Sequence, residues 1–412
     1  MQKELYISDT LRGRVTLPAS KSISNRVLII EALSGGRYEI ENLSEAADTR
    51  VLVEALRTAG GTAEHPALVD IGPAGTAMRF CTAYFAQSDG VWLLTGSERM
   101  KQRPIGLLVD ALRALGADIA YAEKEGYPPL LIKGRKMSAS EVALPANVSS
   151  QYVSALLMLG PVLADGLTLR LTGEIASRPY IDMTMSLMNR FGADASWASD
   201  DTIRVAPRPY VTSAHFAVEA DWSAASYWYE LMALTPDADA SIVLPHLPAS
   251  SLQGDAAVAD FFVPLGVRSE WGEEGLQLSK CAATSEPLHI DFSRQPDLAQ
   301  TLVVTCAMLR RPFRFTGLHS LRIKETDRTT ALQAELVKLG VKIEPVGDDE
   351  IRYDGNSWPV DVVPSIATYS DHRMAMAFAP CALRHPGLVI KDAEVVSKSY
   401  PRFWCDLAPF LA

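Results

Sequence analysis

The strongest constraint on the fold is a segment of one design that recurs six times along the chain. Each copy has small, polar or charged residues, then an apolar run of helix length, then a short loop and a β-rich strand. The copies begin near Ser22, Gly75, Ser149, Asp221, Asp297 and Asp371. Successive starts lie 53, 74, 72, 76 and 74 residues apart. Such a regular interval is typical of a repeated supersecondary unit.

A second helix recurs with the same period and ends at a glycine. These glycines are Gly61, Gly116, Gly192, Gly266 and Gly340. Apolar residues stand at helical spacing before each of them, and glycine suits the left-handed position that follows a helix. The second helices are amphipathic, so one face of each should meet water. The first helices are apolar nearly all round and should be buried on all sides.

The repeats predict the domain organisation. Three repeats amount to roughly 200 residues, the size of an ordinary domain. We place one boundary near Ser20 and another just before Asp221, which gives an α/β protein of two similar domains. The first spans residues 20–220, and the second combines residues 1–19 with 221–412. The N-terminal strands LYISDT and GRVTLP are expected to complete the sheets of the second domain.

Composition excludes several classes of protein. The net charge of −10 argues against general binding of nucleic acid. No apolar run reaches the roughly 20 residues needed to span a bilayer, and MQKELYISDT is no signal peptide. The five cysteines form no CxxC pair. We therefore expect buried thiols in a reducing cytoplasm, with neither disulfides nor a zinc site.

The start of the first repeat, PASKSISNR, suits an anion. Ser20 or Ser22 can cap the helix that follows, and Lys21 and Arg26 add positive charge. Free backbone N–H groups and the helix dipole favour negative charge at the same place. A bland capped surface helix is the alternative for this stretch taken alone. If the buried helices of each domain run the same way, six such helix ends would face one cleft between two domains.

Further stretches of the first half repeat this pattern. Glycines precede a helix in GPAGTAMR, which is neither a Walker A motif nor GxGxxG, and a plain turn is the alternative. Arg103 precedes Pro104 and a helix, where a solvated basic face is the alternative. Hydroxyl, amide, cationic and phenol groups come from SSQ at 149–151 and SRPY at 177–180. For these two segments, ordinary helix capping is the alternative interpretation.

The second half adds acid–base groups. Asp297 begins the fifth buried helix, as a cap or as a general base among cations. The stretch LRIKETDRTT holds the densest charges, where Asp327 could orient a neighbouring arginine and leave Glu325 free for acid–base work. A salt-bridged helix start is the alternative. The stretch DHR at 371–373 begins the sixth helix, and Lys398 adds a late cation. His372 has no partner at metal spacing, so we expect no metal there.

With these pieces in order, the chain resembles the 5-enolpyruvylshikimate-3-phosphate synthase family of enolpyruvyl transferases. The motifs that carry the resemblance are PASKSISNR, AGTAMR, RMKQRPI, SSQY, SRPYID, KETDR, DHRMAM and SKSYP, and they cover nearly the whole chain. The resemblance implies two similar domains, each of three βαβαββ units in an inside-out α/β barrel, that close around ligands. That fold agrees with the sixfold repeat.

The resemblance also implies a reaction and its residues. The enolpyruvyl group of phosphoenolpyruvate would pass to the 5-hydroxyl of shikimate 3-phosphate, releasing phosphate. Asp297 would be the base for the hydroxyl, Glu325 the acid for the methylene carbon, and Lys21 would share proton transfer. Shikimate 3-phosphate would be bound by Lys21, Ser22, Arg26, Ser149, Ser150, Gln151, Ser177, Tyr180, Asp297, Ser320 and Lys324, with Ser320 standing where an asparagine is usual. Phosphoenolpyruvate would be bound by Lys21, Gly75, Arg103, Gln151, Arg328, Arg373 and Lys398.

Two alternatives remain open at this point. The related transferase that acts on UDP-N-acetylglucosamine usually has a cysteine in the loop before the arginine matching Arg103, but residues 95–103 contain none. The alternative from another functional class is a catalytically silent anion-binding module. The presence of Asp297 and Glu325 argues against it. The addition chemistry needs a proton donor and an acceptor but no metal or redox cofactor. By resemblance we expect a monomer that acts on small molecules, with no nucleic acid or membrane partner.

Overall fold

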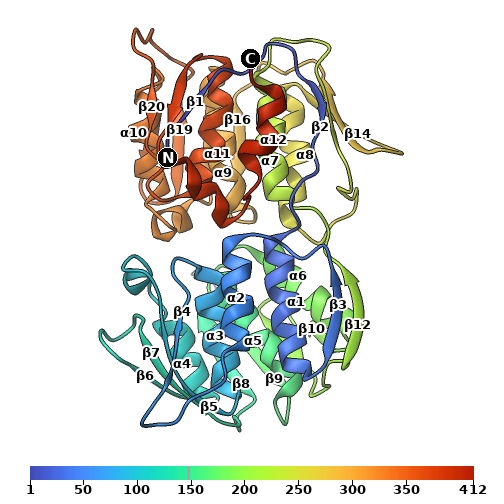
Figure 1. Ribbon diagram of the computed structural model, residues 1–412, viewed down its shortest axis with the longest axis vertical. Helices are drawn as coiled ribbons and strands as arrows, with labels where there is room; N and C mark the ends of the chain where they lie inside the picture. Colours follow the sequence, from blue (N-terminus) through green and yellow to red (C-terminus); the bar gives the residue numbers. More distant parts are fainter. Residues whose placement is uncertain (146–148) are drawn as a thin grey trace. The chain divides into compact units, whose positions relative to one another are not determined.

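The computed structural model describes residues 1–145 and 149–412 of the chain (Figure 1). These residues form two compact units. One, called here the continuous unit, contains residues 20–218. The other, called here the split unit, combines residues 1–19 with residues 219–412.

The continuous unit alternates helices and short strands. Its elements are α1 (Lys21–Ser34), β3 (Arg37–Glu41), α2 (Ala47–Arg57), β4 (Ala67–Asp70), α3 (Gly75–Gln87), β5 (Gly90–Thr95), α4 (Gly106–Ala114), β6 (Asp118–Tyr121), β7 (Leu130–Gly134), β8 (Glu141–Pro145), α5 (Ser150–Leu159), β9 (Leu167–Thr172), α6 (Arg178–Arg190), β10 (Ala195–Trp197), β11 (Thr202–Val205) and β12 (Ser213–Ala217). The run from β4 to β7 has the order βαβαββ, and the run from β8 to β11 repeats it. The expected repeat is therefore present in this unit.

The sheets of the continuous unit share one topology. The strand orders are β4-β5-β7-β6 and β10-β11-β9-β8. In both sheets the first two strands of the repeat pair in parallel, across a helix, and the other pairs are antiparallel. The remaining pair, β3 with β12, is parallel and joins the start of the unit to its end. A helical crossover is the usual way to connect parallel neighbours.

The split unit begins with the N-terminus and resumes after residue 218. Its elements are β1 (Lys3–Leu5), β2 (Arg12–Arg14), α7 (Trp222–Leu234), β13 (Ser241–Leu244), the 3₁₀ turn η3 (Gly254–Ala257), α8 (Val258–Phe262), β14 (Val267–Gly272), β15 (Gly275–Lys280), β16 (Leu288–Asp291), η5 (Pro296–Leu298), α9 (Ala299–Met308), β17 (Phe313–Thr316), η6 (His319–Ile323), α10 (Arg328–Val337), β18 (Glu344–Val346), β19 (Glu350–Tyr353), β20 (Ser365–Ile366), α11 (His372–Phe378), β21 (Leu388–Ile390), η8 (Ala393–Lys398) and α12 (Phe403–Leu407).

The sheets of the split unit follow the same plan. The orders β14-β15-β13-β2 and β16-β17-β19-β18 again combine one parallel pair with antiparallel pairs, and a third sheet has the order β1-β21-β20. Both N-terminal strands take part: β1 pairs with β21, and β2 pairs in parallel with β13. They supply strands that residues 219–412 lack, as the sequence leads us to expect.

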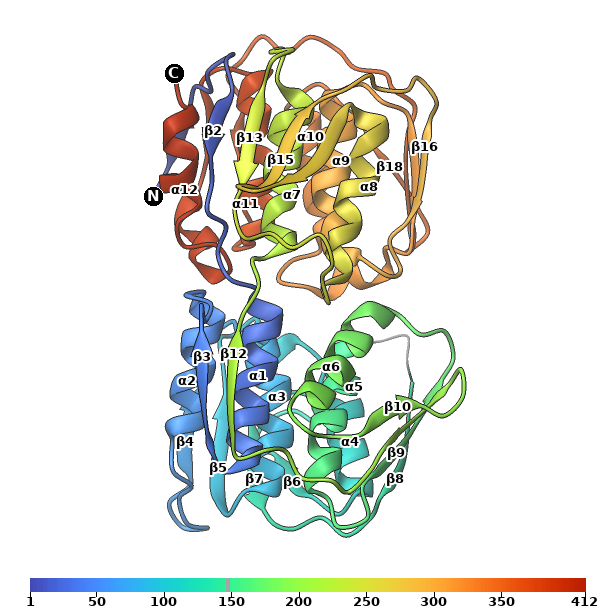
Figure 2. The same cartoon turned by 90° about the vertical axis from the view of Figure 1, so that its right-hand side faces the viewer.

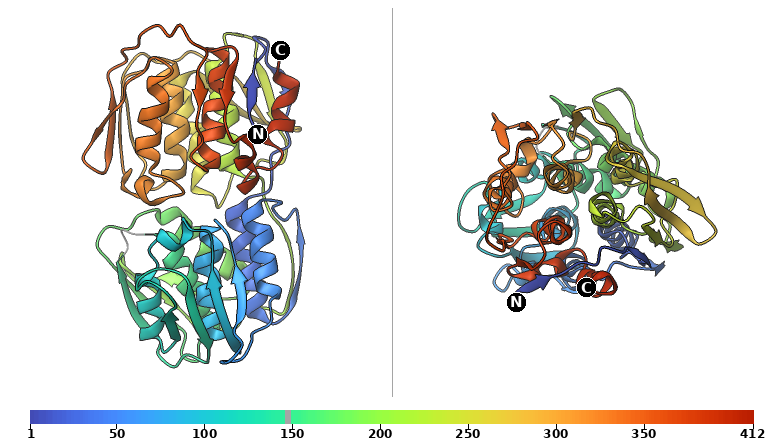
Figure 3. Two further views of the ribbon diagram at one scale, coloured as in Figure 1. Left: turned by 60° about the vertical axis from the view of Figure 1, so that its left-hand side comes forward. Right: turned by 90° about the horizontal axis from the view of Figure 1, so that it is seen from above.

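The helices of each unit lie inside its strands, which is the inside-out arrangement expected for this fold. In the split unit, α9 and α11 are buried at every position, and α7 at all but Ser223. Strands β13 and β15 cover α7 (Figure 2), and α7, α9 and α11 pack on one another (Figure 3). The second helices, such as α2 and α10, keep an exposed face. Both burial predictions are confirmed, because apolar surface all round a helix requires neighbours all round it.

Four of the five glycines predicted to end second helices do so. Gly116, Gly192, Gly266 and Gly340 have positive φ, between 75° and 108°, just after a helix. The prediction for Gly61 is wrong. Helix α2 ends earlier, at Arg57, and Gly61 bridges to Val91. A Cβ at Gly61 would lie 2.1 Å from the carbonyl oxygen of His65, so this glycine permits a close backbone approach instead.

The cysteines of the described chain are all free thiols. Cys81, Cys306 and Cys381 are buried, Cys281 is half-buried and Cys405 is exposed. Burial raises the pKa of the first three, which disfavours the reactive thiolate form. Among the residues that the structure describes, no helix combines the length and apolar character needed to cross a membrane.

Candidate functional site

Asp297 is the centre of a network of charged side chains in the split unit. Its carboxylate lies 2.9 Å from Nη2 of Arg373, 3.4 Å from Nη1 of Arg328 and 3.5 Å from Nζ of Lys324. Three cations that converge on one carboxylate far exceed what capping requires. The alternative interpretation of Asp297 as a simple helix cap does not describe this arrangement.

Helix starts position these groups. Asp297 lies in η5, directly before α9, while Arg328 is the first residue of α10 and Arg373 the second of α11. Buried Asp371 caps α11 by accepting from the backbone N–H of Arg373 at 2.9 Å. The same carboxylate accepts from Nε of Arg328 at 2.8 Å. One residue therefore fixes both the helix start and a buried guanidinium.

Glu325 lies in the same network but is not free. It pairs with Nη2 of Arg328 at 3.1 Å and with Nζ of Lys398 at 2.7 Å, so two cations hold the carboxyl group that the sequence assigns to acid–base work. The expectation for Asp327 is confirmed, because it pairs with Arg322 at 3.3 Å and caps α10. Opposite charges at close range explain both, since a half-buried carboxylate is stabilised by a cation it can reach.

The cations change the acidity of Asp297. Burial alone would raise the pKa of Asp297, but the charges of Arg373, Lys324 and Arg328 outweigh burial and hold it well below its usual range. Asp297 is therefore ionised at neutral pH. Burial lowers the pKa of the Lys324 ammonium, and the charge of Asp297 opposes this. The site thus contains an ionised acceptor surrounded by donors.

The other predicted residue of this unit, Ser320, lies in η6. Its hydroxyl oxygen is buried and has no hydrogen-bond partner within the described part of the chain. All six charged candidates of the split unit belong to the one network: Asp297, Lys324, Glu325, Arg328, Arg373 and Lys398.

In the continuous unit, hydrogen bonds join residues of the first two turns of four helices. The amide of Gln151 at the start of α5 donates to the Thr76 hydroxyl at the start of α3, at 3.1 Å. The Arg26 guanidinium of α1 donates to the hydroxyls of Thr184 in α6, at 2.7 Å, and Ser154 in α5, at 3.1 Å. The N-termini of α1, α3, α5 and α6 are therefore neighbours. Their free N–H groups and dipoles favour an anion at this end of the unit.

Arg26 itself is buried. It is 2% exposed, and burial lowers its pKa to about 10. Its guanidinium also donates to the backbone oxygen of Ser22 at 2.8 Å. Arg26 thus ties α1 to α5 and α6 near their N-termini.

The remaining polar candidates of this unit are half-buried at the helix starts. These are Lys21, Ser22, Ser149, Ser150, Gln151, Ser177 and Tyr180. Lys21 pairs with Asp48 at 3.1 Å. Ser149 caps α5, since its hydroxyl accepts from the N–H of Gln151, and Ser177 has a positive φ of 55° directly before α6. Capping therefore accounts for the hydrogen bond that the Ser149 hydroxyl accepts, whereas Ser150 does not serve as the cap.

Gly75 allows a close approach. A Cβ at this position would lie 2.6 Å from Nη1 of Arg103, so any larger residue would displace the guanidinium. Since Arg103 is half-buried beside the start of α3, the pair brings a cation to the backbone N–H groups of that helix. A plain turn at GPAGTAMR would not require this contact, and neither would a solvated basic face at Arg103.

Sequence reasoning missed several residues of both clusters. Asp48, Ser154 and Thr184 hold cations of the continuous unit, and Asp255 and Ser223 contact the network of the split unit. Polar residues within apolar helices, such as Ser154 and Thr184, were a usable signal, because buried hydroxyls need partners. No such signal marked Asp255.

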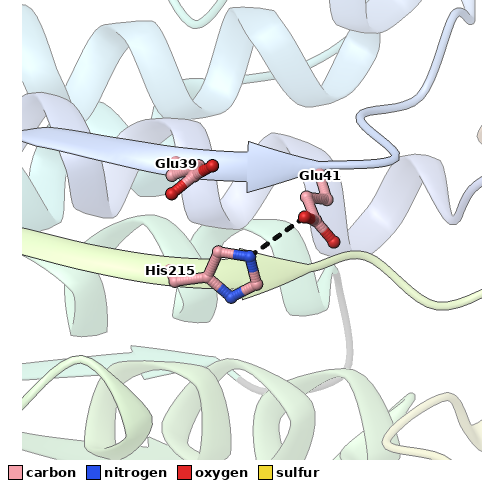
Figure 4. A group of neighbouring side chains, drawn as sticks. All are labelled: Glu39, Glu41 and His215. Carbon is pink, nitrogen blue, oxygen red and sulfur yellow. Dashed lines mark ion pairs between the residues drawn. The ribbon is translucent and has the colours of Figure 1, made fainter.

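Other features of the described residues lie apart from these clusters. The one group of side chains that could hold a metal ion is Glu39, Glu41 and His215, exposed on β3 and β12 (Figure 4). Nε2 of His215 lies 3.1 Å from Glu41, an ordinary exposed ion pair between neighbouring strands. A surface hollow of about 810 Å³ in the split unit is lined by residues such as Phe313, Tyr353 and Trp358, and by none of the candidate residues.

Comparisons with known proteins agree on one family. The family model described as EPSP synthase (3-phosphoshikimate 1-carboxyvinyltransferase) matches residues 5–407. A protein of Bacteroides fragilis named 3-phosphoshikimate 1-carboxyvinyltransferase is 54% identical over 99% of this chain and 97% of its own. One of the same name from Sulfurovum is 36% identical over 96% and 95%. The solved EPSP synthase of Acinetobacter baumannii has a similar fold, with a TM-score of 0.76 at 21% identity, over 100% of this chain and 98% of that one.

Proposed function

Because this chain belongs to the EPSP synthase family, we propose that it transfers the carboxyvinyl group of phosphoenolpyruvate to the 5-hydroxyl of shikimate 3-phosphate and releases phosphate. This is a transferase reaction of the shikimate pathway, which leads to the aromatic amino acids. The observation that carries the proposal at the level of residues is the ionised Asp297 carboxylate among Arg373, Arg328 and Lys324, with Glu325 beside it.

We assign the proton transfers to these two carboxyl groups. As the hydroxyl oxygen of shikimate 3-phosphate bonds to C2 of the enolpyruvyl group, its proton passes to Asp297, and Glu325 gives a proton to the methylene carbon. The resulting tetrahedral intermediate loses phosphate when the bond between C2 and the phosphate ester oxygen breaks. The methyl group returns a proton to Glu325, and the phosphate leaves with the proton held by Asp297. In this scheme Lys21 takes part in the proton transfers together with Asp297 and Glu325.

The substrates themselves would make Asp297 a better base. Its pKa is low because cations surround it. When an anionic substrate pairs with Arg373 or Lys324, part of that positive charge is neutralised, and the pKa of Asp297 rises toward the value a general base needs. Asp297 thereby becomes a more effective proton acceptor when a substrate is bound.

We assign the two anionic substrates to both units. Shikimate 3-phosphate binds Lys21, Ser22, Arg26, Ser149, Ser150, Gln151, Ser177, Tyr180, Asp297, Ser320 and Lys324. Phosphoenolpyruvate binds Lys21, Gly75, Arg103, Gln151, Arg328, Arg373 and Lys398. The proposal thus requires the predicted domains, residues 20–220 and residues 1–19 with 221–412, to act together on one pair of substrates. Converging cations and helix ends offset the repulsion between two phosphates and two carboxylates. The enzyme is proposed to act as a cytoplasmic monomer.

Phosphate release from phosphoenolpyruvate in the presence of shikimate 3-phosphate tests the function. The wild-type protein should release phosphate only when both substrates are present. Glu325→Gln and Asp297→Ala should each lower kcat by at least about a hundredfold, since general acid–base groups contribute about that much or more. The exposed Glu344→Gln, in the same unit, is the control and should retain wild-type turnover.

Two outcomes would contradict the proposal. Wild-type release no greater than background would favour a silent anion-binding module, and wild-type turnover in both carboxyl variants would refute the assigned roles. Arg103→Ala and Arg373→Ala test the requirement for both units. Each should raise the KM for phosphoenolpyruvate, and an effect confined to one unit would refute joint action.

A further inference from the structure

A short turn brings a buried acid to the charged network of the split unit. Asp255 lies in η3 and is 2% exposed. The turn is fixed to the start of α7, because the side chain of Gln253 accepts from the N–H of Trp222 at 3.1 Å and donates to the carbonyl of Ala220 at 2.8 Å. Asp255 is therefore held in place by its neighbours in the chain.

The contacts of Asp255 lead to Arg373 through one hydroxyl. Oδ2 of Asp255 accepts a short hydrogen bond from Oγ of Ser223, the second residue of α7. Nη2 of Arg373 in turn donates to Oγ of Ser223 at 3.5 Å. A hydroxyl has one hydrogen and two lone pairs, so a hydroxyl that donates to Asp255 presents a lone pair to the guanidinium.

The same guanidinium holds Asp297. Nη2 of Arg373 donates to Oδ2 of Asp297 at 2.9 Å, and Nη1 donates to the Asp297 backbone oxygen at 3.1 Å and to the Tyr227 hydroxyl at 3.4 Å. Ser223 and Tyr227 of α7 thus lie against the same Arg373 guanidinium that contacts Asp297. The direction of the Ser223 hydroxyl hydrogen decides whether this side attracts or repels Arg373.

We propose that Asp255 is a positioning residue for the reaction: its carboxylate orients the Ser223 hydroxyl so that Arg373 is held against Asp297, ready for an anionic substrate. This inference rests on the proposed function of Arg373 and Asp297. When Asp255 is protonated, its O–H donates to one lone pair of the Ser223 hydroxyl, and the Ser223 hydrogen turns away from Asp255. The hydroxyl is then no longer fixed with a lone pair toward Arg373, and the negative charge of Asp255 that attracts Arg373 is lost.

Asp255 becomes protonated within a pH range in which the enzyme can be assayed. Burial raises its pKa to about 6, the charge of Asp297 adds to this, and Arg373 and the Ser223 hydrogen bond oppose it, while Asp221 adds a further negative charge. The ionised state that positions Arg373 is therefore present above this pKa and is lost as the pH falls through it. The ionisation of Asp255 should therefore appear in the acid limb of the pH profile of kcat/KM.

The first test compares Asp255→Ala and Asp255→Asn with the exposed Asp260→Asn, which lies on the next helix. Asp255→Ala should lower kcat/KM for phosphoenolpyruvate about tenfold, the worth of one hydrogen bond to a charged group, mainly through KM. The KM for shikimate 3-phosphate should change little. Asp255→Asn should lose the ionisation near 6 from the acid limb of kcat/KM, whereas Asp260→Asn should match the wild type. An acid limb unchanged in Asp255→Asn would overturn the proposal.

A second measurement does not depend on activity. The titration of the Asp255 carboxyl carbon, followed by NMR with ¹³C-labelled aspartate, should shift to higher pH in Ser223→Ala, because the hydrogen bond that favours the carboxylate is removed. An unchanged midpoint would show that Ser223 and Asp255 are not linked and would refute the inference. A wild-type protein that releases no phosphate would instead refute the proposed function and leave this titration to decide the link.

Discussion

At the scale of single residues, Arg328 shows what keeps a buried charge in this protein. It is 1% exposed and contacts the carboxylates of Asp371, Glu325 and Asp297. A buried guanidinium costs several kcal/mol of solvation, which only close partners offset. The loss of any of the three carboxylates would leave charge uncompensated, so these residues depend on one another.

Glu230 is the opposite case, a buried acid without a cation. It lies on α7 at 0% exposure, and within the described residues it has no ion pair. Burial raises the pKa of Glu230 well above its usual range. The folded state therefore holds a proton that the unfolded state releases above about pH 4.5, and the stability that Glu230 contributes is lost as the pH rises.

We predict that Glu230→Gln flattens this dependence. Relative to the variant, the wild-type free energy of unfolding should fall by about 1.4 kcal/mol per pH unit as the pH rises above about 5, until Glu230 ionises in the folded state. Urea unfolding at several pH values measures the difference. The exposed Glu286→Gln, in the same unit, should keep the wild-type slope. Parallel curves for wild type and Glu230→Gln would mean that Glu230 titrates normally.

Residues at helix starts could be predicted from the sequence, whereas those that reach them from elsewhere could not. Asp297 and Arg373 begin apolar runs, so their position in the repeat marks them. Asp255 begins no such run and is one of 49 acidic residues. Its partner Ser223 is 32 residues away, and nothing in the local pattern indicates that the two meet.

At the scale of elements, the first turn of a helix determines where a charged side chain points. Asp327 caps α10 by accepting from the N–H of Thr330 at 3.1 Å and from its hydroxyl at 2.9 Å. The next residue, Arg328, depends on that turn. A cap of this kind contributes about 1 kcal/mol of stability.

We predict that Asp327→Ala lowers the free energy of unfolding by about 1 kcal/mol and raises the KM for phosphoenolpyruvate, since a frayed first turn no longer fixes Arg328. Chemical denaturation and steady-state kinetics measure the two effects. Asp327→Asn keeps a capping oxygen and should restore most of both. If Asp327→Ala changed neither quantity, Arg328 would be held by its ion pairs alone.

The burial of elements followed from their pattern, but some of their ends did not. An apolar run without a polar face, such as residues 299–308, can only be a core helix. Helix α2 ends at Arg57, three residues before Gly60, the first glycine of its segment, and the backbone becomes extended at Thr58. Gly61 is needed there by strand contacts between distant segments, which no local signal reveals.

At the scale of the whole chain, the two units differ in continuity. The continuous unit is formed by residues 20–218 without a break, whereas the split unit needs both ends of the chain. A contiguous segment with its own core can fold by itself. The regular repeat predicts two domains of three repeats each, but the repeat starts alone do not show which strands the N-terminus pairs with.

We predict that residues 20–218 expressed alone fold cooperatively but release no phosphate, because Asp297 and Glu325 are missing. A single sigmoidal urea transition followed by circular dichroism would show cooperative folding. Residues 219–412 alone should not unfold cooperatively, since they lack β1 and β2. Cooperative unfolding of that shorter segment would mean that the two N-terminal strands are dispensable.

The pairing of β1 with β21 has a consequence for biosynthesis. A ribosome delivers Lys3–Leu5 long before their partners Leu388–Ile390. Until those partners emerge, β1 has no strand to pair with, while residues 20–218 can already fold. Lys3 lies in β1, and Arg12 and Arg14 lie in β2; their charge helps keep an unpaired strand edge from pairing with other nascent proteins.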